Sequence, residues 1–410
     1  MRLSGLFSGK CWQAKAPVPL VRGPFAGKVG QALSPAKSAL LVLAILPLAG
    51  WAQQAITCQR GQCVEVFAGQ ADIGQQLRVK AHGPVTLEAG LEKELKYTAR
   101  VVVRAANEGE ARHMLERYAV RVTKEGDWWV LTAPGEPLAA TLELRSPRLT
   151  AVTIVTANGP VEASGIDGSL LVDSITGPLI ANRIRGDCQL RTRGGDIHAG
   201  EIGGLLDSIT GFGSITVGSV HGEAALQTMG GDIAVQDAGG RLRADTGAGT
   251  IRIAKAAGAV DATTGGGLIW VGSANGLVTA HNMAGMIDVE SAAGVHCESG
   301  AGGVQLGRIS GSMRVSTAMG NIVASLLSAA PDSYLATGDG DITLVIPSNL
   351  GVTIQAENAM ADSLRRIFSD FPQIQSQRLG TRVVAQGRVN GGGPVLRISS
   401  ADGTIFLKRR

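Results

Sequence analysis

The chain has 410 residues, enough for two or three ordinary domains or for one elongated repeat domain with end pieces. Apolar residues make up 44% of the chain and aromatic residues only 4%, while 57 residues are glycine. This composition predicts a thin core of Val, Ile, Leu, Ala and Thr, and the modest charge with many β-branched residues argues against a disordered chain.

Residues 1–52 are predicted to be a signal peptide. They carry six basic residues and no acidic one, and 38–50 is an apolar run followed by small residues that suit cleavage after Ala52. The run is short and contains proline, so we expect no stable membrane span after cleavage, although an uncleaved inner-membrane anchor is the alternative. The basic part is long, which leaves open a true start downstream of Met1. Without the leader, 32 basic residues face 34 acidic ones, which gives no argument for nucleic acid as a partner.

Residues 53–150 are predicted to be a mostly β capping region with one short helix. The stretches 97–105 and 118–133 alternate as strands do, and 108–118 has apolar residues at helical spacing. Trp128 and Trp129 are interpreted as a plug for the end of a narrow core, with a glycan-stacking platform as the alternative. Cys58 and Cys63 form a possible disulfide in an oxidising compartment, with two free thiols as the alternative.

Glycine occupies every ninth position from Gly159 to Gly303. The true period is eighteen, because the two halves differ: Ile215 and Val217 have large apolar equivalents eighteen residues away, whereas the inward positions of the other half are smaller and less uniform. Apolar residues two apart predict strands with one buried face. The corner glycines of the period are Gly159, Gly177, Gly195, Gly213, Gly231, Gly249, Gly267, Gly285 and Gly303. Three residues before them stands a hydroxyl column that includes Thr192, Thr210, Thr228, Thr246 and Thr264 and is broken by Asn282.

This periodicity predicts an all-β fold, a single-stranded parallel β-solenoid of about 18 residues per coil over residues 151–347. Each coil has two strands and two corners, and each strand pairs with its equivalent one coil along, about 4.8 Å away. Glycine at a corner permits positive φ and close approach of stacked backbones. The hydroxyl column satisfies corner groups along the stack.

One coil is irregular. Between Gly294 and Gly311 the spacing shortens by one, and an unshifted register turns His296 and Glu298 inward. We interpret this as a bulge, with a buried His–Glu site as the less favoured alternative. Residues 348–410 are predicted to be a C-terminal cap whose last thirty residues close as a hairpin, although Gly403, Ile405 and Leu407 repeat the half-coil pattern.

The element "TANGPVEASGIDG" at 156–168, its echoes, and the ending "GRVNGGGPVLRISSADGTIFLKRR" resemble the bacterial "putative adhesin" β-strand-repeat family, the domain of unknown function 4097. The resemblance covers residues 60–410. It implies a right-handed solenoid at the cell envelope, and it supplies no catalytic or binding residues.

The sequence predicts no catalytic residues, no cofactor and no metal. The six histidines share no ligand spacing, and Asp196, Asp232 and Asp341 do not complete the Asp column of a calcium-binding nonapeptide roll. Asp173, Asp207 and Asp245 share no column with a regular series of basic residues, as a polysaccharide lyase or hydrolase would need. The basic patch is interpreted as a solvated face; it consists of Arg183, Arg185, Arg191 and Arg193.

The sequence therefore favours an exported, non-enzymatic solenoid, periplasmic or on the cell surface, that acts as an adhesin-like binding or scaffold protein. Its expected partner is an unidentified envelope component, glycan or protein, contacted by many repeated weak interactions. A glycan-active enzyme and a regulatory component of envelope stress are the alternatives.

Overall fold

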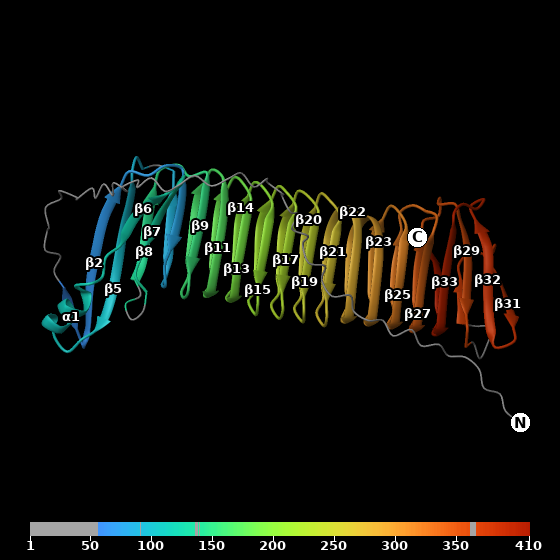
Figure 1. Ribbon diagram of the computed structural model, residues 1–410. Coiled ribbons are helices and arrows are strands. Elements are labelled where there is room, and N and C mark those ends of the chain that lie inside the picture. The colour runs from blue at the N-terminus through green and yellow to red at the C-terminus, as the bar shows by residue number, and fades with distance from the viewer. Residues whose placement is uncertain (1–55, 91, 136–137, 139, 361–365) are drawn as a thin grey trace, which may run out of the picture. The chain divides into compact units, whose positions relative to one another are not determined.

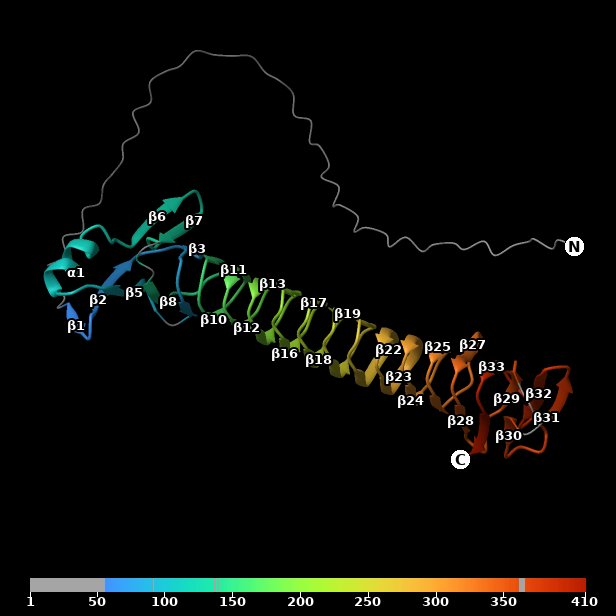
Figure 2. The same ribbon diagram turned by 90° about the horizontal axis from the view of Figure 1, so that it is seen from below.

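The computed structural model describes residues 56–90, 92–135, 138, 140–360 and 366–410, so the predicted signal peptide lies outside the described residues. The described residues hold 34 strands and one helix. Their strands form stacked coils that follow one another along a single axis (Figures 1 and 2). None of the described helices has the length and apolar character needed to cross a membrane.

Two parallel sheets make the body of the stack. Face 1 contains β9 (Ala151–Thr156), β11 (Ser169–Thr176), β13 (Cys188–Gly194), β15 (Leu206–Thr210), β17 (Ala224–Thr228), β19 (Leu242–Thr246), β21 (Val260–Thr264), β25 (Met313–Met319) and β27 (Ser333–Asp339). Face 2 contains β10 (Val161–Ile166), β12 (Leu179–Ile184), β14 (Ile197–Ile202), β16 (Ile215–Val220), β18 (Ile233–Ala238), β20 (Ile251–Ala256), β24 (Val304–Ile309), β26 (Ile322–Leu326) and β28 (Ile342–Ile346). The long strands β22 (Ile269–Ala284) and β23 (Ile287–Ala301) bend through a corner and join both faces.

The register between coils confirms the predicted solenoid and its period. Ile215 pairs with Ile233 and Val217 with Val235, each eighteen residues further along the chain. The inward side chains of both faces are buried and form one continuous hydrophobic cluster. The outward side chains stand in columns, so each coil presents its own residues at the same positions as its neighbours.

The corner glycines allow the coils to approach each other this closely. A Cβ on Gly213 would fall on the carbonyl of Gly195, and a Cβ on Gly231 would fall on the carbonyl of Gly213. Positive φ is confined to Gly159, Gly177 and Gly285 within the predicted corner series. In the middle of the stack, therefore, the lack of space for a side chain explains the glycine better than backbone conformation does.

The predicted hydroxyl column forms a ladder of hydrogen bonds along this corner. The Thr246 hydroxyl donates to the Gly231 carbonyl at 2.8 Å and accepts from the Gly249 N–H at 3.1 Å. Equivalent bonds to the preceding coil join Thr192 to Gly177, Thr210 to Gly195, Thr228 to Gly213 and Thr264 to Gly249. Asn282 continues the ladder, because its side-chain amide donates to the Gly267 carbonyl at 2.6 Å.

One coil has seventeen residues, and it lies earlier than the sequence indicates. Ala274 pairs with Ala292 at a spacing of eighteen, whereas Val278 pairs with Val295 at seventeen. The glycine that approaches Gly285 is consequently Gly302, and the assignment of Gly303 to the corner series is wrong by one residue.

The end of the chain is also arranged differently from the prediction. The last strands, β33 (Val395–Asp402) and β34 (Ile405–Arg409), run parallel to β27 and β28 and add one more coil to the stack. Beyond this coil lie β29 (Val352–Asn358) beside β33 and β30 (Ile367–Ser369) beside β34. The antiparallel pairs join β32 (Arg382–Val389) to β29 and to β31 (Gln375–Leu379). The predicted closing hairpin is wrong, because β29 separates β32 from β33.

The N-terminal region is mostly β with one helix. Here β3 (Gln76–Lys80) and β4 (Val85–Ala89) pair in parallel with β9 and β10, and β7 (Trp128–Thr132) and β8 (Ala140–Ser146) pair with β3 and β4. Antiparallel strands β1 (Thr57–Gln59), β2 (Gln62–Ala71) and β5 (Leu95–Arg104) follow β8, and β6 (Arg121–Glu125) borders β7. Helix α1 (Glu108–Leu115) begins after Asn107, whose side chain accepts from the Glu110 N–H.

Replacing Thr246 with valine should destabilise the stack. The change keeps the shape of the side chain but leaves the Gly231 carbonyl and the Gly249 N–H without their partner, which costs about 1–3 kcal/mol. Chemical unfolding measures this loss. The matched control is Thr216→Val on the outer side of β16, for which we expect a change within about 0.5 kcal/mol. Equal effects of the two substitutions would contradict the ladder.

Candidate functional site

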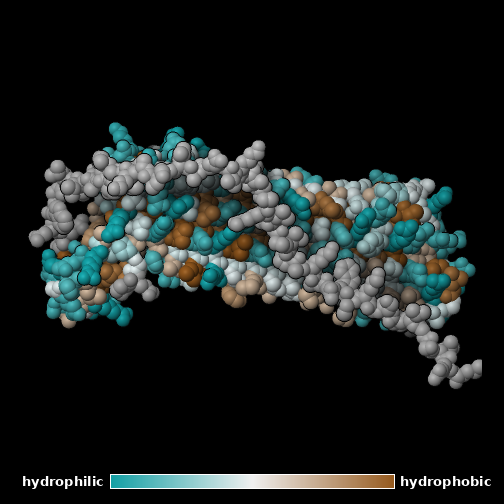
Figure 3. All heavy atoms as spheres, in the orientation of Figure 1, coloured by the Kyte–Doolittle hydropathy of each residue, from teal (hydrophilic) through white to brown (hydrophobic). Residues whose placement is uncertain are grey.

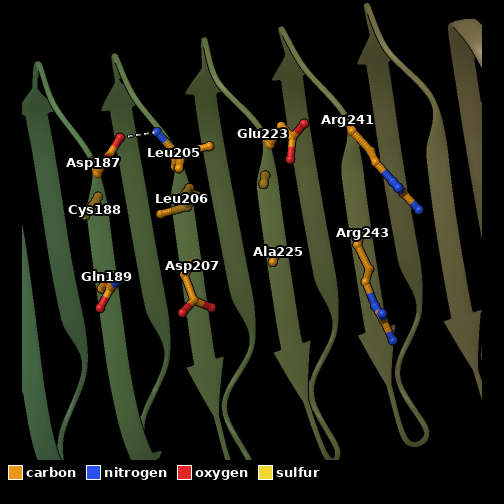
Figure 4. A pocket seen from close by; sticks show the side chains of 11 residues that line it. Asp187, Cys188, Gln189, Leu205, Leu206, Asp207, Glu223, Ala225, Arg241 and Arg243 are labelled. Atoms are coloured by element: carbon orange, nitrogen blue, oxygen red, sulfur yellow. Dashed lines mark hydrogen bonds between the residues drawn. The ribbon is translucent and has the colours of Figure 1, made fainter. Parts of the chain in front are cut away.

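The outer side of face 1 carries a hollow of about 440 Å³. It spans four successive coils, from β13 to β19, and Figure 4 shows its side chains. The polar and small residues that define it are Asp187, Asp207, Glu223, Ala225, Arg241 and Arg243. A volume of this size lies in the range of small-molecule sites, about 300–1,000 Å³. We call this feature the charged hollow.

A single small residue forms the floor of the charged hollow. Ala225 stands in an outward column in which Asp207 precedes it by one coil and Arg243 follows it by one coil. Both neighbours have longer side chains, so the column dips at Ala225 (Figure 4). Leu205, an exposed apolar residue, adds to the wall beside it.

Along the stack the carboxylates precede the arginines, and Glu223 lies one coil from Arg241 in the same column. Asp207 and Glu223 lie on the side of β15 and β17, whereas Arg241 and Arg243 both come from the β19 coil. Each of three charged groups is held from outside the hollow: Asp207 by Arg191 at 3.3 Å, Arg243 by Asp245 at 2.7 Å, and Arg241 by Asp261 at 3.7 Å. The contact with Asp245 raises the pKa of the Arg243 guanidinium, so this group is charged throughout the physiological range.

Cys188 lies beneath the charged hollow and faces the core. Its burial raises the pKa of the thiol to about 12, and the buried thiol of Cys297 is shifted in the same way. Neither thiol is a nucleophile at neutral pH, because the thiolate is the reactive form.

A second hollow on face 1, of about 680 Å³, lies at the seventeen-residue coil. His281 Nδ1 is 3.3 Å from one carboxylate oxygen of Glu298, and His296 Nε2 is 3.3 Å from the other. The shifted register turns His296 and Glu298 outward, which excludes the buried His–Glu pair considered from the sequence. No group of three or more His, Cys, Asp or Glu residues is arranged to hold a metal ion in the part of the chain that the structure describes.

Face 2 carries one aromatic side chain beside two carboxylates. The Trp270 indole N–H donates to Glu290 at 3.2 Å, and Asp288 pairs with Trp270 in the neighbouring coil. Burial, and then the nearby Glu290 carboxylate, raise the pKa of Asp288. We did not predict this arrangement, because the residues in the outward column of Trp270 vary from coil to coil.

In the structure, the residues named from the sequence support the fold. The predicted glycines and threonines occupy the corner beside the hollows, and Cys58 and Cys63 form a disulfide. The carboxylates of Asp196, Asp232 and Asp341 each accept a backbone N–H of the following coil, from Ser214, Thr250 and Thr404 respectively. Trp128 and Trp129 lie on β7, each with a cationic side chain over its ring.

The predicted basic patch is divided between the two faces. Arg183 and Arg185 lie at β12, whereas Arg191 and Arg193 lie on β13. Arg185 forms an ion pair with Asp167 at 2.9 Å.

The column of Asp207 holds no regular series of basic residues, but it does hold one arginine. Asp207 and Arg243 occupy the same column two coils apart. Their separation of thirty-six residues, twice the period, was the signal in the sequence that could have found them.

No model of a known protein family matches the chain, and no curated protein matches it. Among solved structures, a "putative cell adhesion protein" from Clostridium sporogenes is 9% identical, with a TM-score of 0.20, over 85% of this chain and 99% of its own. A "putative adhesin" from Parabacteroides merdae is 12% identical, with a TM-score of 0.24, over 69% and 95%. Another from Bacteroides fragilis is 9% identical, with a TM-score of 0.17, over 84% and 97%. Scores this low carry no argument about function, and membership of the domain-4097 family stays a prediction.

Neither core cysteine should react in the folded protein. In a Cys11→Ser variant at pH 8, a thiol reagent should label less than one group per folded chain, and it should label Cys188 and Cys297 after denaturation. The folded state keeps these protons up to about pH 12, whereas the unfolded chain releases them near the ordinary pKa of 9. Stability should therefore fall between about pH 9 and 12, and less so after Cys188→Ala and Cys297→Ala. Rapid labelling of the folded chain would contradict this burial.

Proposed function

We propose that this protein is an exported, non-enzymatic β-solenoid that binds a component of the bacterial cell envelope in the manner of an adhesin. The observation that carries the proposal is the charged hollow, because side chains from four successive coils build it and none of the four could build it alone. Stacking thus supplies a broad contact surface, over which weak interactions add.

The surface of face 1 supports a role in binding. Outward apolar side chains, including Val155, Leu171 and Ile209, lie exposed among charged ones. Figure 3 shows apolar and polar residues side by side over the coils of this view. Apolar area bordered by charges is typical of surfaces that contact other molecules.

Two features support export. The leader at 1–52 has the charge and apolar run of a signal peptide. The disulfide between Cys58 and Cys63 suits an oxidising compartment, because thiols in the cytosol are kept reduced.

A glycan-active enzyme is the second candidate, favoured by Asp288 and Glu290. These two carboxylates lie on the same side of β23 with Trp270 next to them, and the raised pKa of Asp288 suits a proton donor. This candidate requires release of sugar fragments from envelope polysaccharide and loss of that release in Asp288→Asn. Our proposal expects retention of the polysaccharide without any cleavage.

Binding to isolated envelope material tests the proposal. Cell-wall sacculi and membrane vesicles are incubated with the purified protein and sedimented, and the bound fraction is measured. We expect retention that falls at least fivefold in the double variant Asp207→Lys/Glu223→Lys, because the charge of the hollow is reversed on one side.

The matched control reverses the same number of charges on face 2. Glu162→Lys/Glu201→Lys alters two exposed carboxylates there and should leave retention within about twofold of the unaltered protein. Absence of retention for the unaltered protein on every material would overturn the proposal. Equal losses in the two double variants would show that only overall charge matters and would also overturn it.

A further inference from the structure

We infer that the charged hollow binds the free ends of a short peptide, with the ammonium group toward Asp207 and Glu223 and the carboxylate toward Arg241 and Arg243. This inference rests on the proposed binding function and names the class of ligand for the same site. It follows from the arrangement of charge, floor and length in the hollow.

Asp207 and Arg243 stand on opposite sides of a nonpolar floor, and Glu223 precedes that floor on the same coil. Asp207 and Glu223 come from β15 and the start of the β17 coil, whereas both arginines come from the β19 coil. Between Asp207 and Arg243 lies Ala225, whose methyl group offers no hydrogen bond. A ligand that satisfies all three parts carries a cation at one end, an anion at the other and a small apolar body between them.

The charged groups are oriented before a ligand arrives. Arg191 holds Asp207 from the β13 side, and Asp245 and Asp261 hold Arg243 and Arg241 from the far side. These pairs do not cross the hollow, so binding requires no ion pair over Ala225 to be broken. Groups that are already in place lose less conformational freedom on binding, which favours affinity.

The length of the hollow selects the length of the ligand. Asp207 and Arg243 are separated by two strand spacings, or about 10 Å between backbones. The ion pairs with Arg191 and Asp245 hold these two side chains from the outer ends of the gap. An extended chain spans about 3.5 Å per residue, so a dipeptide or tripeptide fits, whereas the two charges of a single α-amino acid are too close together.

The two sides also differ in the bonds that they offer. A carboxylate only accepts hydrogen bonds, which suits the three donors of an ammonium group. Two guanidinium groups present planar pairs of donors, which match the two oxygens of a carboxylate. A ligand bound in the opposite direction would place like charges together, so the hollow also fixes the direction of the peptide.

Titration of the protein with tri-alanine tests the inference, with binding followed by calorimetry or by NMR of the protein. The comparison ligand is N-acetyl tri-alanine amide, which has the same body without either terminal charge. We expect saturable binding of tri-alanine, and binding of the blocked peptide weaker by at least about tenfold, which corresponds to the loss of charged hydrogen bonds.

Two variants connect the binding to this hollow. Ala225→Gln fills the floor with a side chain that the same column already carries at Gln189, and Arg243→Gln removes one guanidinium. Each should weaken tri-alanine binding at least about tenfold. The matched controls, Ala254→Gln and Arg252→Gln, change exposed residues of the same types on β20 and should have no effect beyond about twofold. Thermal unfolding checks that all four variants fold.

Four outcomes would overturn the inference: no binding of tri-alanine at 20 mM, equal binding of the free and blocked peptides, unchanged binding in folded Ala225→Gln and Arg243→Gln, or equal weakening in the controls. These results are separate from those on envelope material. Loss of envelope retention with tri-alanine binding intact refutes the proposed function alone, and retention without tri-alanine binding refutes only the ligand class.

Discussion

The close approach of one corner glycine to the carbonyl of the preceding coil is the constraint on which the structure depends. A side chain at Gly213 or Gly231 has no space, because the backbone of the neighbouring coil occupies it. The coils therefore stack at the spacing of hydrogen-bonded strands, and both faces remain in register. The threonine ladder reinforces the same corner, because each hydroxyl joins two coils and satisfies backbone groups away from water.

A regular stack makes the outer surface depend on small differences between coils. Inward positions repeat, whereas outward columns vary freely, so a single short side chain produces a depression. Ala225 between Asp207 and Arg243 is such a difference. The seventeen-residue coil is another, because it turns His296 and Glu298 outward next to His281. Specific chemistry on this protein thus arises where the repeat is broken or varied, while the repeat itself supplies the support.

Much of the fold could be predicted because the same constraint repeats in the sequence. Glycine, the hydroxyl column and the apolar pairs recur every eighteen residues, and they predicted the solenoid and its two strands per coil. The predicted series of corner glycines is wrong at the seventeen-residue coil. Gly294 and Gly303 continue the spacing of nine in the sequence, but Gly302 is the glycine that packs against Gly285. The placement of β33 and β34 could not be predicted, since the half-coil pattern at Gly403 does not state which earlier coil it joins. The charged hollow was missed because its outward residues do not repeat from coil to coil, so only the thirty-six residues between Asp207 and Arg243, twice the period, point to it.

Cysteine crosslinking between neighbouring coils tests the stacked register most directly. In a chain without Cys11, the pair Thr216→Cys/Ala234→Cys lies eighteen residues apart on face 2, and Thr279→Cys/His296→Cys lies seventeen apart on face 1. A short bifunctional thiol reagent should join both pairs within single chains. Thr279→Cys alone should not join the native Cys297, which is buried in the core. Failure of the first pair would contradict the stacked coils, and crosslinking of position 279 to Cys297 would contradict the seventeen-residue coil.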